Sequence, residues 1–231
     1  MSKIVSIHQP QYLPWVPYFD KILQSDEFIF LDNVSYQKNG MQNRNKIKTA
    51  NGDVWLTVPV EFHLGQLINE TKIARPEILK KHLKTLEMSY KKAPFYDEVM
   101  NWLGPILNRS YVFLSEVAMD ATLGILRYLN YAGRVIVAST LKKEGKGSEL
   151  VRNLCLEQQA SVYLSGQGGK NYMDMDDFKL HNIEVLFQEY HAVTYPQLYS
   201  KIGFIENLSI IDLLFNVGQE SVRYIEEGRI M

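Results

Sequence analysis

The chain begins with a short apolar run, residues 4–7, that ends abruptly at the sequence HQP, residues 8–10. A run of this length and composition predicts a buried β-strand. Pro10 and Pro14 cannot donate to a strand ladder and bias their predecessors toward extended conformations, so a loop must follow. Pro17 is suited to the first turn of a helix. The opening segment therefore predicts a strand, a loop and a helix in succession.

Further apolar runs of the same kind follow along the chain and are separated by segments with helical or hairpin character. They lie at residues 28–31, 135–138, 162–164 and 185–187. Strands that alternate with helices predict an α/β fold with a largely parallel, Rossmann-like sheet. We expect all of these runs to join one sheet that carries helices on both faces.

Two segments depart from this simple alternation. Residues 43–49 and 54–60 flank the dipeptide Asn51-Gly52, and Asn-Gly between two strand-like runs is the strongest short signal for a β-hairpin. Residues 75–131 show helical spacing, which predicts three helices that form an insertion or cap over the sheet. We therefore expect a single α/β domain over the 231 residues, with residues 75–131 as a helical insertion within it.

Composition limits the class of protein. Hydrophobic residues make up 46% and charged residues 22% of the chain, as in ordinary globular proteins. The formal net charge of −1 argues against general nucleic-acid binding. The single cysteine, Cys155, excludes an internal disulfide and is typical of a buried packing thiol. The chain opens without a signal-peptide pattern, and no apolar run approaches the roughly 20 residues of a membrane helix, so we expect a cytoplasmic protein.

Polar residues follow the ends of several predicted strands. His8 follows the first strand, and Asp32 follows the second. The fourth strand is followed by a glycine-broken segment that includes Ser165, Gly166, Gln167, Gly168 and Tyr172. Because open α/β sheets bind ligands outside the carboxyl ends of their strands, we expect His8 and this segment to face one crevice. The glycines predict backbone groups that approach a ligand closely, although a flexible surface turn is the alternative.

The segment that leads into the predicted hairpin is unusually rich in amides and cations. Its candidate binding residues are Tyr36, Lys38, Gln42, Asn43, Arg44, Asn45 and Lys46. On a strand, Arg44, Lys46 and Lys48 share one face, which predicts either an anion-binding row or an ordinary solvated strand face. Arg44 is the best phosphate ligand among them, because its guanidinium fork makes paired charge-assisted bonds.

Several familiar catalytic sets are absent from the sequence. The histidines are dispersed, there is no cysteine pair and there is no GxSxG motif, so the sequence offers neither a metal site nor a covalent mechanism. A histidine with a pKa near 6.5 is a competent general base at neutral pH, which makes His8 the candidate catalytic base. A structural histidine bonded to a loop carbonyl is the alternative. Asp32 could bind ribose hydroxyls, orient His8 or cap a turn.

Three motifs, IHQPQYLPW, FLDNVSYQKNGMQNRNKIK and WLTVPV, resemble the WbqC-like family, which is found among bacterial polysaccharide (O-antigen) genes. The motifs YLSGQGGKNYMD, YPQ and IIDLLFNVG extend the resemblance over nearly the whole chain. The resemblance implies transfer of an acyl or aminoacyl group onto a nucleotide-linked amino sugar during surface-polysaccharide synthesis. In that reaction His8 would deprotonate the attacking amine.

The implied reaction also gives roles to the other candidate residues. Lys38, Arg44 and Lys46 would hold the pyrophosphate of a sugar nucleotide. Residues 165–170 would contact the acyl or aminoacyl donor, or the developing oxyanion, through backbone donors. Recognition of the sugar hydroxyls would fall to the amide side chains of Gln9, Gln42, Asn43 and Asn45. The tyrosines counted among the substrate-binding candidates are Tyr12, Tyr18, Tyr36 and Tyr172.

The opening strand, loop and helix are also similar in outline to nucleotidyl-transferring enzymes of the HIGH-motif superfamily. Pro17-Tyr18 stands where a Gly-His pair would be expected, so this similarity concerns the fold alone. Two other functions stay open. One is an ATP-dependent nucleotidyl-transferring or amide-forming ligase, and the other is a non-catalytic module that binds a sugar nucleotide. The sequence identifies neither a cofactor nor an oligomeric state.

Overall fold

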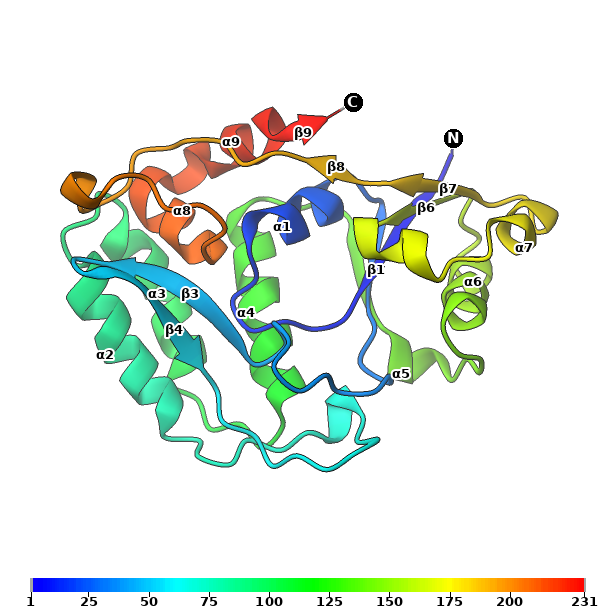
Figure 1. The fold of residues 1–231 in the computed structure, drawn as a ribbon, viewed down its shortest axis with the longest axis horizontal. Coiled ribbons are helices and arrows are strands. Elements are labelled where there is room, and N and C mark those ends of the chain that lie inside the picture. Colours follow the sequence, from blue (N-terminus) through cyan, green and yellow to red (C-terminus); the bar gives the residue numbers. More distant parts are fainter. Residues whose placement is uncertain (1, 231) are drawn as a thin grey trace.

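The computed structural model describes residues 2–230. Its centre is a sheet in the order β5 (Arg134–Val137), β2 (Glu27–Phe30), β1 (Ile4–His8), β6 (Val162–Ser165) and β7 (Glu184–Phe187). Every neighbouring pair of strands in this sheet is parallel. The predicted α/β class with a largely parallel, Rossmann-like sheet is therefore confirmed (Figure 1).

The order of the strands reverses beside β1. From β1 the chain moves to β2 and then to β5 on one side, and it returns to the other side of β1 to place β6 and β7. In open α/β sheets such a reversal opens a crevice between the two strands at their carboxyl ends, where ligands bind. The segments that follow β1 and β6 therefore border this crevice.

Helices cover both faces of the sheet, which explains why its strands are short apolar runs. The helices are α1 (Val16–Leu23), α2 (Ile78–Tyr90), α3 (Tyr96–Leu107), α4 (Leu114–Tyr128), α5 (Ala138–Leu141), α6 (Ser148–Glu157), α7 (Met175–Leu180), α8 (Ile210–Val217) and α9 (Ser221–Glu227). Val5 and Ile7 of β1 pack in a cluster with α6 and α7. Phe28 and Phe30 of β2 pack in a larger cluster with α1, α4 and α8. Figure 1 shows these two layers on opposite sides of the sheet.

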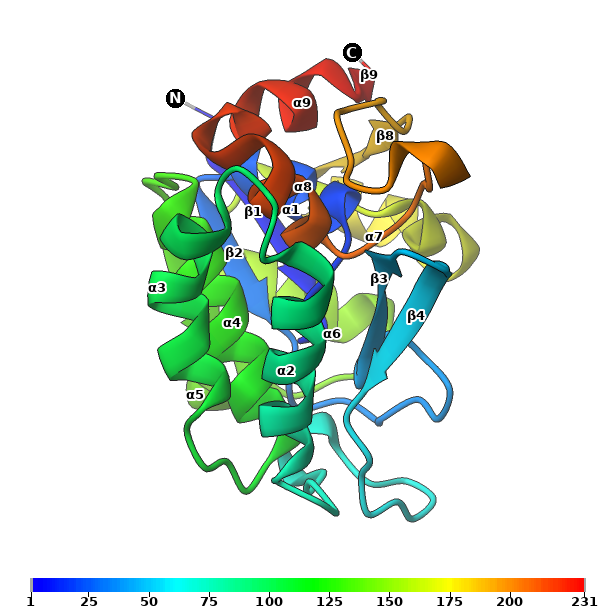
Figure 2. The same cartoon turned by 90° about the vertical axis from the view of Figure 1, so that its left-hand side faces the viewer.

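The hairpin and the three central helices form as expected. The hairpin consists of β3 (Arg44–Thr49) and β4 (Gly52–Thr57), which pair antiparallel around the predicted turn. Ile47 and Leu56 of the hairpin belong to the same core cluster as α2, α3 and α4. Figure 2 shows these three helices packed together, with the hairpin beside α2. The helices share one core with the sheet. That residues 75–131 form an insertion within a single domain therefore stays a prediction.

The C-terminal part contains elements that the sequence did not predict. A short antiparallel pair joins β8 (Glu189–Tyr190) to β9 (Arg229–Ile230). Between β8 and α8 the chain follows an irregular path over residues 192–208, broken only by the single turn η3 (Ser200–Ile202). We call residues 192–208 the wall segment, because it forms one side of the cavity described below. Within residues 2–230, no helix combines the length and the apolar character needed to cross a membrane.

Candidate functional site

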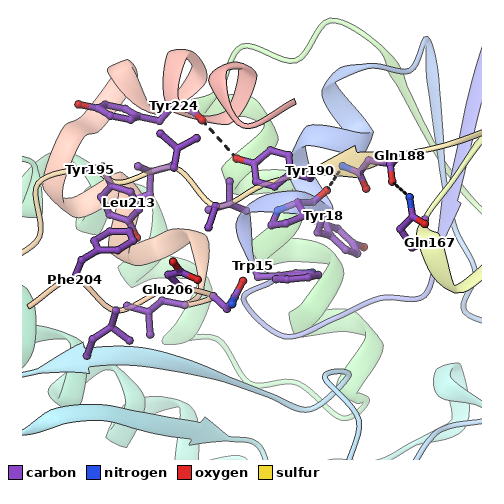
Figure 3. Close-up of a pocket in the computed structure, with 18 of the residues that line it drawn as sticks. Trp15, Tyr18, Gln167, Gln188, Tyr190, Tyr195, Phe204, Glu206, Leu213 and Tyr224 are labelled. Carbon is purple, nitrogen blue, oxygen red and sulfur yellow. Dashed lines mark hydrogen bonds between the residues drawn. The ribbon is translucent and has the colours of Figure 1, made fainter. Parts of the chain in front are cut away.

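A cavity of about 330 Å³ lies where the strand order reverses, and we call it the switch-point cavity. The carboxyl end of β1 and the start of α1 line it through His8, Trp15, Val16, Pro17 and Tyr18, and the segment after β6 lines it through Gly166, Gln167 and Gly168. The remaining lining residues are Gln188, Tyr190, Ala192, Val193, Tyr195, Phe204, Ile205, Glu206, Asn207, Leu208, Leu213 and Tyr224 (Figure 3). His8 and the glycine segment therefore share one crevice.

His8 ends β1 and is fastened by a buried lysine of α1. Lys21 is only 2% exposed, its Nζ donates to the Ile7 carbonyl at 3.0 Å, and it lies 2.9 Å from His8 Nδ1. The Tyr18 ring packs against the imidazole at a centroid distance of 4.7 Å. The strand end and the first helix thus fix the orientation of the ring.

Burial changes the protonation of both members of this pair. Burial lowers the pKa of Lys21 to about 7, so this amine exchanges its proton near neutral pH. Burial, and to a lesser degree the Lys21 charge, holds the pKa of His8 well below 6.5. His8 is therefore uncharged at neutral pH.

Gln11 completes a hydrogen-bonded chain with this pair. Its Nε2 lies 3.3 Å from His8 Nε2, and its Oε1 is buried without a hydrogen-bond partner. When Lys21 is uncharged, His8 donates from Nδ1 to Lys21 Nζ and accepts from the Gln11 amide at Nε2. When Lys21 is charged it donates to Nδ1, the ring proton moves to Nε2, and a rotated Gln11 amide accepts it through oxygen. The pair can thus pass one proton from Nε2 through the ring to Lys21.

A second buried network holds the edge of the cavity at Gln188. Gln188 Nε2 donates to the Pro17 carbonyl at 2.8 Å and to Asp20 Oδ2 at 2.5 Å. The Asp20 carboxylate is fully buried and also accepts from Arg229 Nε at 3.0 Å. Gln167 Nε2 donates to the Gln188 main-chain carbonyl at 2.6 Å (Figure 3). The glycine segment, α1 and the C-terminal strand are thereby joined around the cavity.

The predicted sugar-reading amides make hydrogen bonds inside the protein. Gln42 Nε2 donates to Gln9 Oε1 at 2.7 Å, and Asn45 Nδ2 donates to the Leu13 carbonyl at 2.7 Å. Asn43 Nδ2 donates to a main-chain carbonyl at 2.9 Å. These bonds fasten the loop after β1 to the hairpin, and they hold Leu13 at a positive φ of 47°. These amides do not line the switch-point cavity, and their contact with a sugar stays a prediction.

The predicted tyrosines occupy different environments. Tyr18 lines the cavity, whereas Tyr12 is fully buried and its hydroxyl lies 2.8 Å from His82 Nδ1. Tyr36 is also buried, and Tyr172 is 53% exposed outside the cavity. Among these four side chains, only Tyr18 is placed to touch a ligand in the cavity.

Asp32 and Ser165 also lie outside the cavity lining. The Asp32 carboxylate accepts the backbone N–H of Ser139 at 2.9 Å and the Ser139 hydroxyl at 2.7 Å. Of the three roles open to Asp32, the structure therefore shows the contact that caps a turn, at the start of α5. Ser165 is buried, and its hydroxyl donates to the Gly166 carbonyl at 3.1 Å. A catalytic role for Asp32 stays a prediction.

Two of the predicted cations share an exposed face of the hairpin. Arg44 and Lys46 lie over the Trp55 ring at 4.7 and 5.1 Å from its centroid. Lys46 pairs with Asp53 at 2.6 Å. Arg44 donates to the Asn39 carbonyl at 2.6 Å, and its Nε is buried without a hydrogen-bond partner. Anion binding at this face stays a prediction.

The other two cations of this region have different surroundings. Lys38 is exposed, and its Nζ lies 5.7 Å from the centroid of the Phe62 ring. Lys48 is buried, and its Nζ donates to Gln197 Oε1 at 3.0 Å and to the Gly203 carbonyl at 2.6 Å. Lys48 therefore holds the wall segment and is not part of an exposed row.

The hairpin borders the switch-point cavity without lining it. The backbone N–H of Ser209 donates to the Lys46 carbonyl at 2.8 Å, and Leu208 beside it lines the cavity. Figure 3 shows the hairpin directly below the cavity. A molecule that extends out of the cavity at this side would meet the hairpin.

Most of the chain matches one protein family. The model of the WbqC-like protein family matches residues 9–224, which include every lining residue of the cavity except His8. The chain belongs to the WbqC-like protein family. This WbqC-like protein is also 37% identical over 233 residues to the uncharacterized protein Rv1507c of Mycobacterium tuberculosis, with 98% of this chain and 99% of that protein covered. The resemblance in the sequence motifs is therefore confirmed.

Part of the cavity of this WbqC-like protein was not predicted from the sequence. The missed lining residues include Gln188, Tyr190, Tyr195, Phe204, Glu206 and Tyr224. Lys21, which contacts His8 without lining the cavity, was also missed. The YPQ motif was the available signal, because Tyr195 lines the cavity and Gln197 fastens the wall segment. Within residues 2–230, no group of three or more His, Cys, Asp or Glu side chains is arranged to hold a metal ion.

Proposed function

We propose that this WbqC-like protein transfers an acyl or aminoacyl group onto the amino group of a nucleotide-linked amino sugar. The observation that carries the proposal is the His8–Lys21 pair, of which His8 lines the switch-point cavity together with the glycine segment. The family resemblance supports a place in surface-polysaccharide synthesis. The geometry supports the proton transfer that amide formation requires.

The paired bases act on the attacking amine. An ammonium must lose a proton before its nitrogen can attack a carbonyl carbon. Once the amine has displaced the Gln11 amide, His8 accepts that proton at Nε2 and passes the proton on Nδ1 to uncharged Lys21, which lies 2.9 Å away. The amine nitrogen then bonds to the acyl carbon, the bond between that carbon and its leaving group breaks, and the leaving group takes the second proton of the nitrogen. Because Lys21 receives the proton, the pKa of the pair suits a base near neutral pH.

The glycine segment supports the placement of the acyl group. An added Cβ at Gly166 or at Gly168 would meet no other part of the protein within 4 Å. Packing therefore does not require glycine at these positions, and open space lies beside both. Backbone N–H groups in such a segment can approach a carbonyl oxygen and stabilise the charge that it develops.

The nucleotide of the amino sugar is expected on the hairpin face. Trp55 is 45% exposed and offers a surface for stacking, and the Arg44 guanidinium beside it offers charge-assisted bonds to phosphate. No lysine or arginine is among the residues that line the switch-point cavity in the described part of the chain. A pyrophosphate therefore fits the hairpin face better than the cavity, and the amino sugar would reach from one to the other.

Mass spectrometry of the purified protein with a nucleoside-diphosphate amino sugar tests this function. The donors are acyl thioesters and aminoacyl esters, each with and without ATP. We expect the sugar nucleotide to gain the mass of the donor group without ATP. Product and pyrophosphate that form only with ATP would replace the transferase by the ligase. Tight binding of an unchanged sugar nucleotide with every donor would instead identify a binding module.

A further inference from the structure

The lining of the switch-point cavity has a distinctive composition. Aromatic rings dominate it, namely Trp15, Tyr18, Tyr190, Tyr195, Phe204 and Tyr224. Among the lining residues in the described part of the chain, Glu206 carries the only carboxylate, and lysine and arginine are absent. Because ring faces and a carboxylate both attract positive charge, this surface favours a cation over an anion.

Glu206 is directed into this space. Figure 3 shows its carboxylate pointing into the cavity, between Trp15 on one side and Phe204 and Leu213 on the other. No hydrogen bond joins it to the other residues drawn there. Glu206 is an exposed residue at the edge of the cavity, so its carboxylate can accept hydrogen bonds from a ligand that enters from solvent.

A partly buried clamp fixes the position of Glu206, although the wall segment is irregular. The preceding residue, Ile205, donates its N–H to Gln197 Oε1 at 3.0 Å, and its carbonyl accepts from Gln197 Nε2 at 3.0 Å. Lys48 donates to the same Gln197 oxygen. A side chain that bonds both main-chain groups of a residue holds it as a strand partner would. The carboxylate of Glu206 is therefore presented by a held backbone.

We infer that the switch-point cavity binds a small organic cation, with the ammonium group paired to Glu206 and the apolar body against the aromatic rings. Binding of such a cation is argued from the cavity alone. Only the part that the cation plays in a reaction rests on the proposed function. Two sources have this chemistry. One is the α-ammonium of an aminoacyl donor, and the other is the ammonium of the amino sugar before it is deprotonated.

Isothermal titration calorimetry with matched pairs of ligands tests the inference and distinguishes the sources. Phenylalaninamide stands for an aminoacyl group and glucosamine for an amino sugar. Their uncharged partners are N-acetylphenylalaninamide and N-acetylglucosamine. We expect at least one ammonium compound to bind about tenfold or more tightly than its N-acetylated partner, as a charge-assisted bond implies. The compound that shows this preference identifies the source.

Two variants with the same change of charge provide the control. Glu206→Gln should reduce the affinity for the preferred ammonium compound about tenfold and leave the melting temperature unchanged. Glu226→Gln, at an exposed position of α9 that does not line the cavity, should leave that affinity unchanged. Equal binding of charged and N-acetylated ligands, no binding of any of them, or unchanged affinity in Glu206→Gln would overturn the inference. Ammonium selectivity without any transfer product would refute only the proposed reaction.

Discussion

His8 is a weak base when it is considered alone, because burial holds its pKa well below 6.5. Lys21 has a pKa of about 7 and is therefore the stronger base of the two. A proton that binds to the His8 ring is passed on to Lys21. The two groups are 2.9 Å apart, so they titrate as a pair and their pKa values belong to the pair. At the scale of single residues, the relevant base is therefore the pair.

Replacement of His8 separates catalysis from binding. His8→Gln keeps a polar side chain of related reach and removes the proton acceptor. A general base contributes about 10²- to 10⁴-fold in rate and little ground-state affinity, so we expect turnover to fall at least about tenfold with affinity within a few-fold. Initial rates of amide formation and calorimetric titration measure the two quantities. His63→Gln, at an exposed position, is the control. Normal turnover in His8→Gln would remove His8 from the mechanism.

Replacement of Lys21 tests the relay through the direction of a pH shift. In the relay, the rate of the unaltered protein falls as the pH drops through about 7, where the pair takes up its proton. Lys21→Met forces the proton to stay on buried His8, so this limb should move below pH 6.5 and the plateau rate should fall. If Lys21 acts only as a nearby charge, its removal raises the pKa of His8, and no loss of plateau rate is expected. The pH–rate profiles of the two proteins decide between these outcomes.

At the residue scale, the ends of the predicted strands indicated which residues lie at the site. The sequence did not indicate which side chains tertiary packing would bring there. His8 and the glycine segment could be assigned to one crevice because parallel strands release their next residues at one edge of the sheet. Lys21 lies in an apolar helix, and its burial depends on neighbours from distant parts of the chain. Glu206 lies in a segment without periodicity, so nothing in the local pattern indicated that it would face a cavity.

At the scale of elements, the hairpin supports the cavity. Its exposed face carries Arg44 and Lys46 around Trp55, and its buried end carries Lys48 toward the wall segment. The alternation of Arg44, Lys46 and Lys48 was correctly recognised as one strand face. The wall segment covers the end of that face. Lys48 is therefore buried, and the choice between an anion-binding row and a solvated face concerns Arg44 and Lys46. Because the wall segment has no helical or strand periodicity, its position could not be predicted from the sequence.

The hairpin offers a matched pair for measuring this support. Lys48→Met leaves Gln197 Oε1 and the Gly203 carbonyl without their cationic donor, so we expect a loss of about 1–3 kcal/mol in the free energy of unfolding. Lys46→Met removes a more exposed ion pair with Asp53, for which at most about 1 kcal/mol is expected. Urea denaturation of both variants measures the difference. Equal losses would mean that Lys48 does not anchor the wall segment.

Arg44 tests whether the hairpin face holds a nucleotide. Arg44→Ala removes the guanidinium charge beside Trp55, so sugar-nucleotide binding should weaken by about 1.5–3 kcal/mol, the range of a charge-assisted bond. The melting temperature without ligand should change little, because the side chain lies on the outer face of the hairpin over Trp55. Calorimetric titration with a nucleoside-diphosphate amino sugar measures the effect. Unchanged affinity would leave this face as a solvated strand surface.

At the scale of the whole molecule, distant parts of the chain meet at the reversal of the strand order. The cavity combines residues that follow β1, residues that follow β6 and the C-terminal wall, and buried polar groups join these parts. Asp20 links α1 to Arg229, and Asp212 accepts hydrogen bonds from Tyr90 and Tyr195. The sequence predicted the sheet because apolar runs are local signals. It did not predict these networks, because each joins residues that are far apart in the chain.

Buried histidines make the stability of the whole fold depend on pH. Burial lowers the pKa of His82 to about 4, and the pKa of His8 is also held below its usual 6.5. Between pH 6.5 and 4 the unfolded chain therefore binds protons that the folded protein does not bind. Stability should fall as the pH decreases through this window, and below pH 4 His82 should add no further loss. At about 1.4 kcal/mol for each pKa unit, His82 alone should account for roughly 3 kcal/mol.

The slope of stability against pH isolates the contribution of His82. His82→Asn retains a polar group that can bond the Tyr12 hydroxyl and removes the titration. The raised pKa values of buried Asp20 and Asp212 act with the opposite sign, but they contribute equally in both proteins and cancel in the difference. Urea denaturation at several pH values between 7 and 4 should give a flatter curve for the variant. Parallel curves for the two proteins would show that His82 is protonated in the folded state as readily as in the unfolded chain.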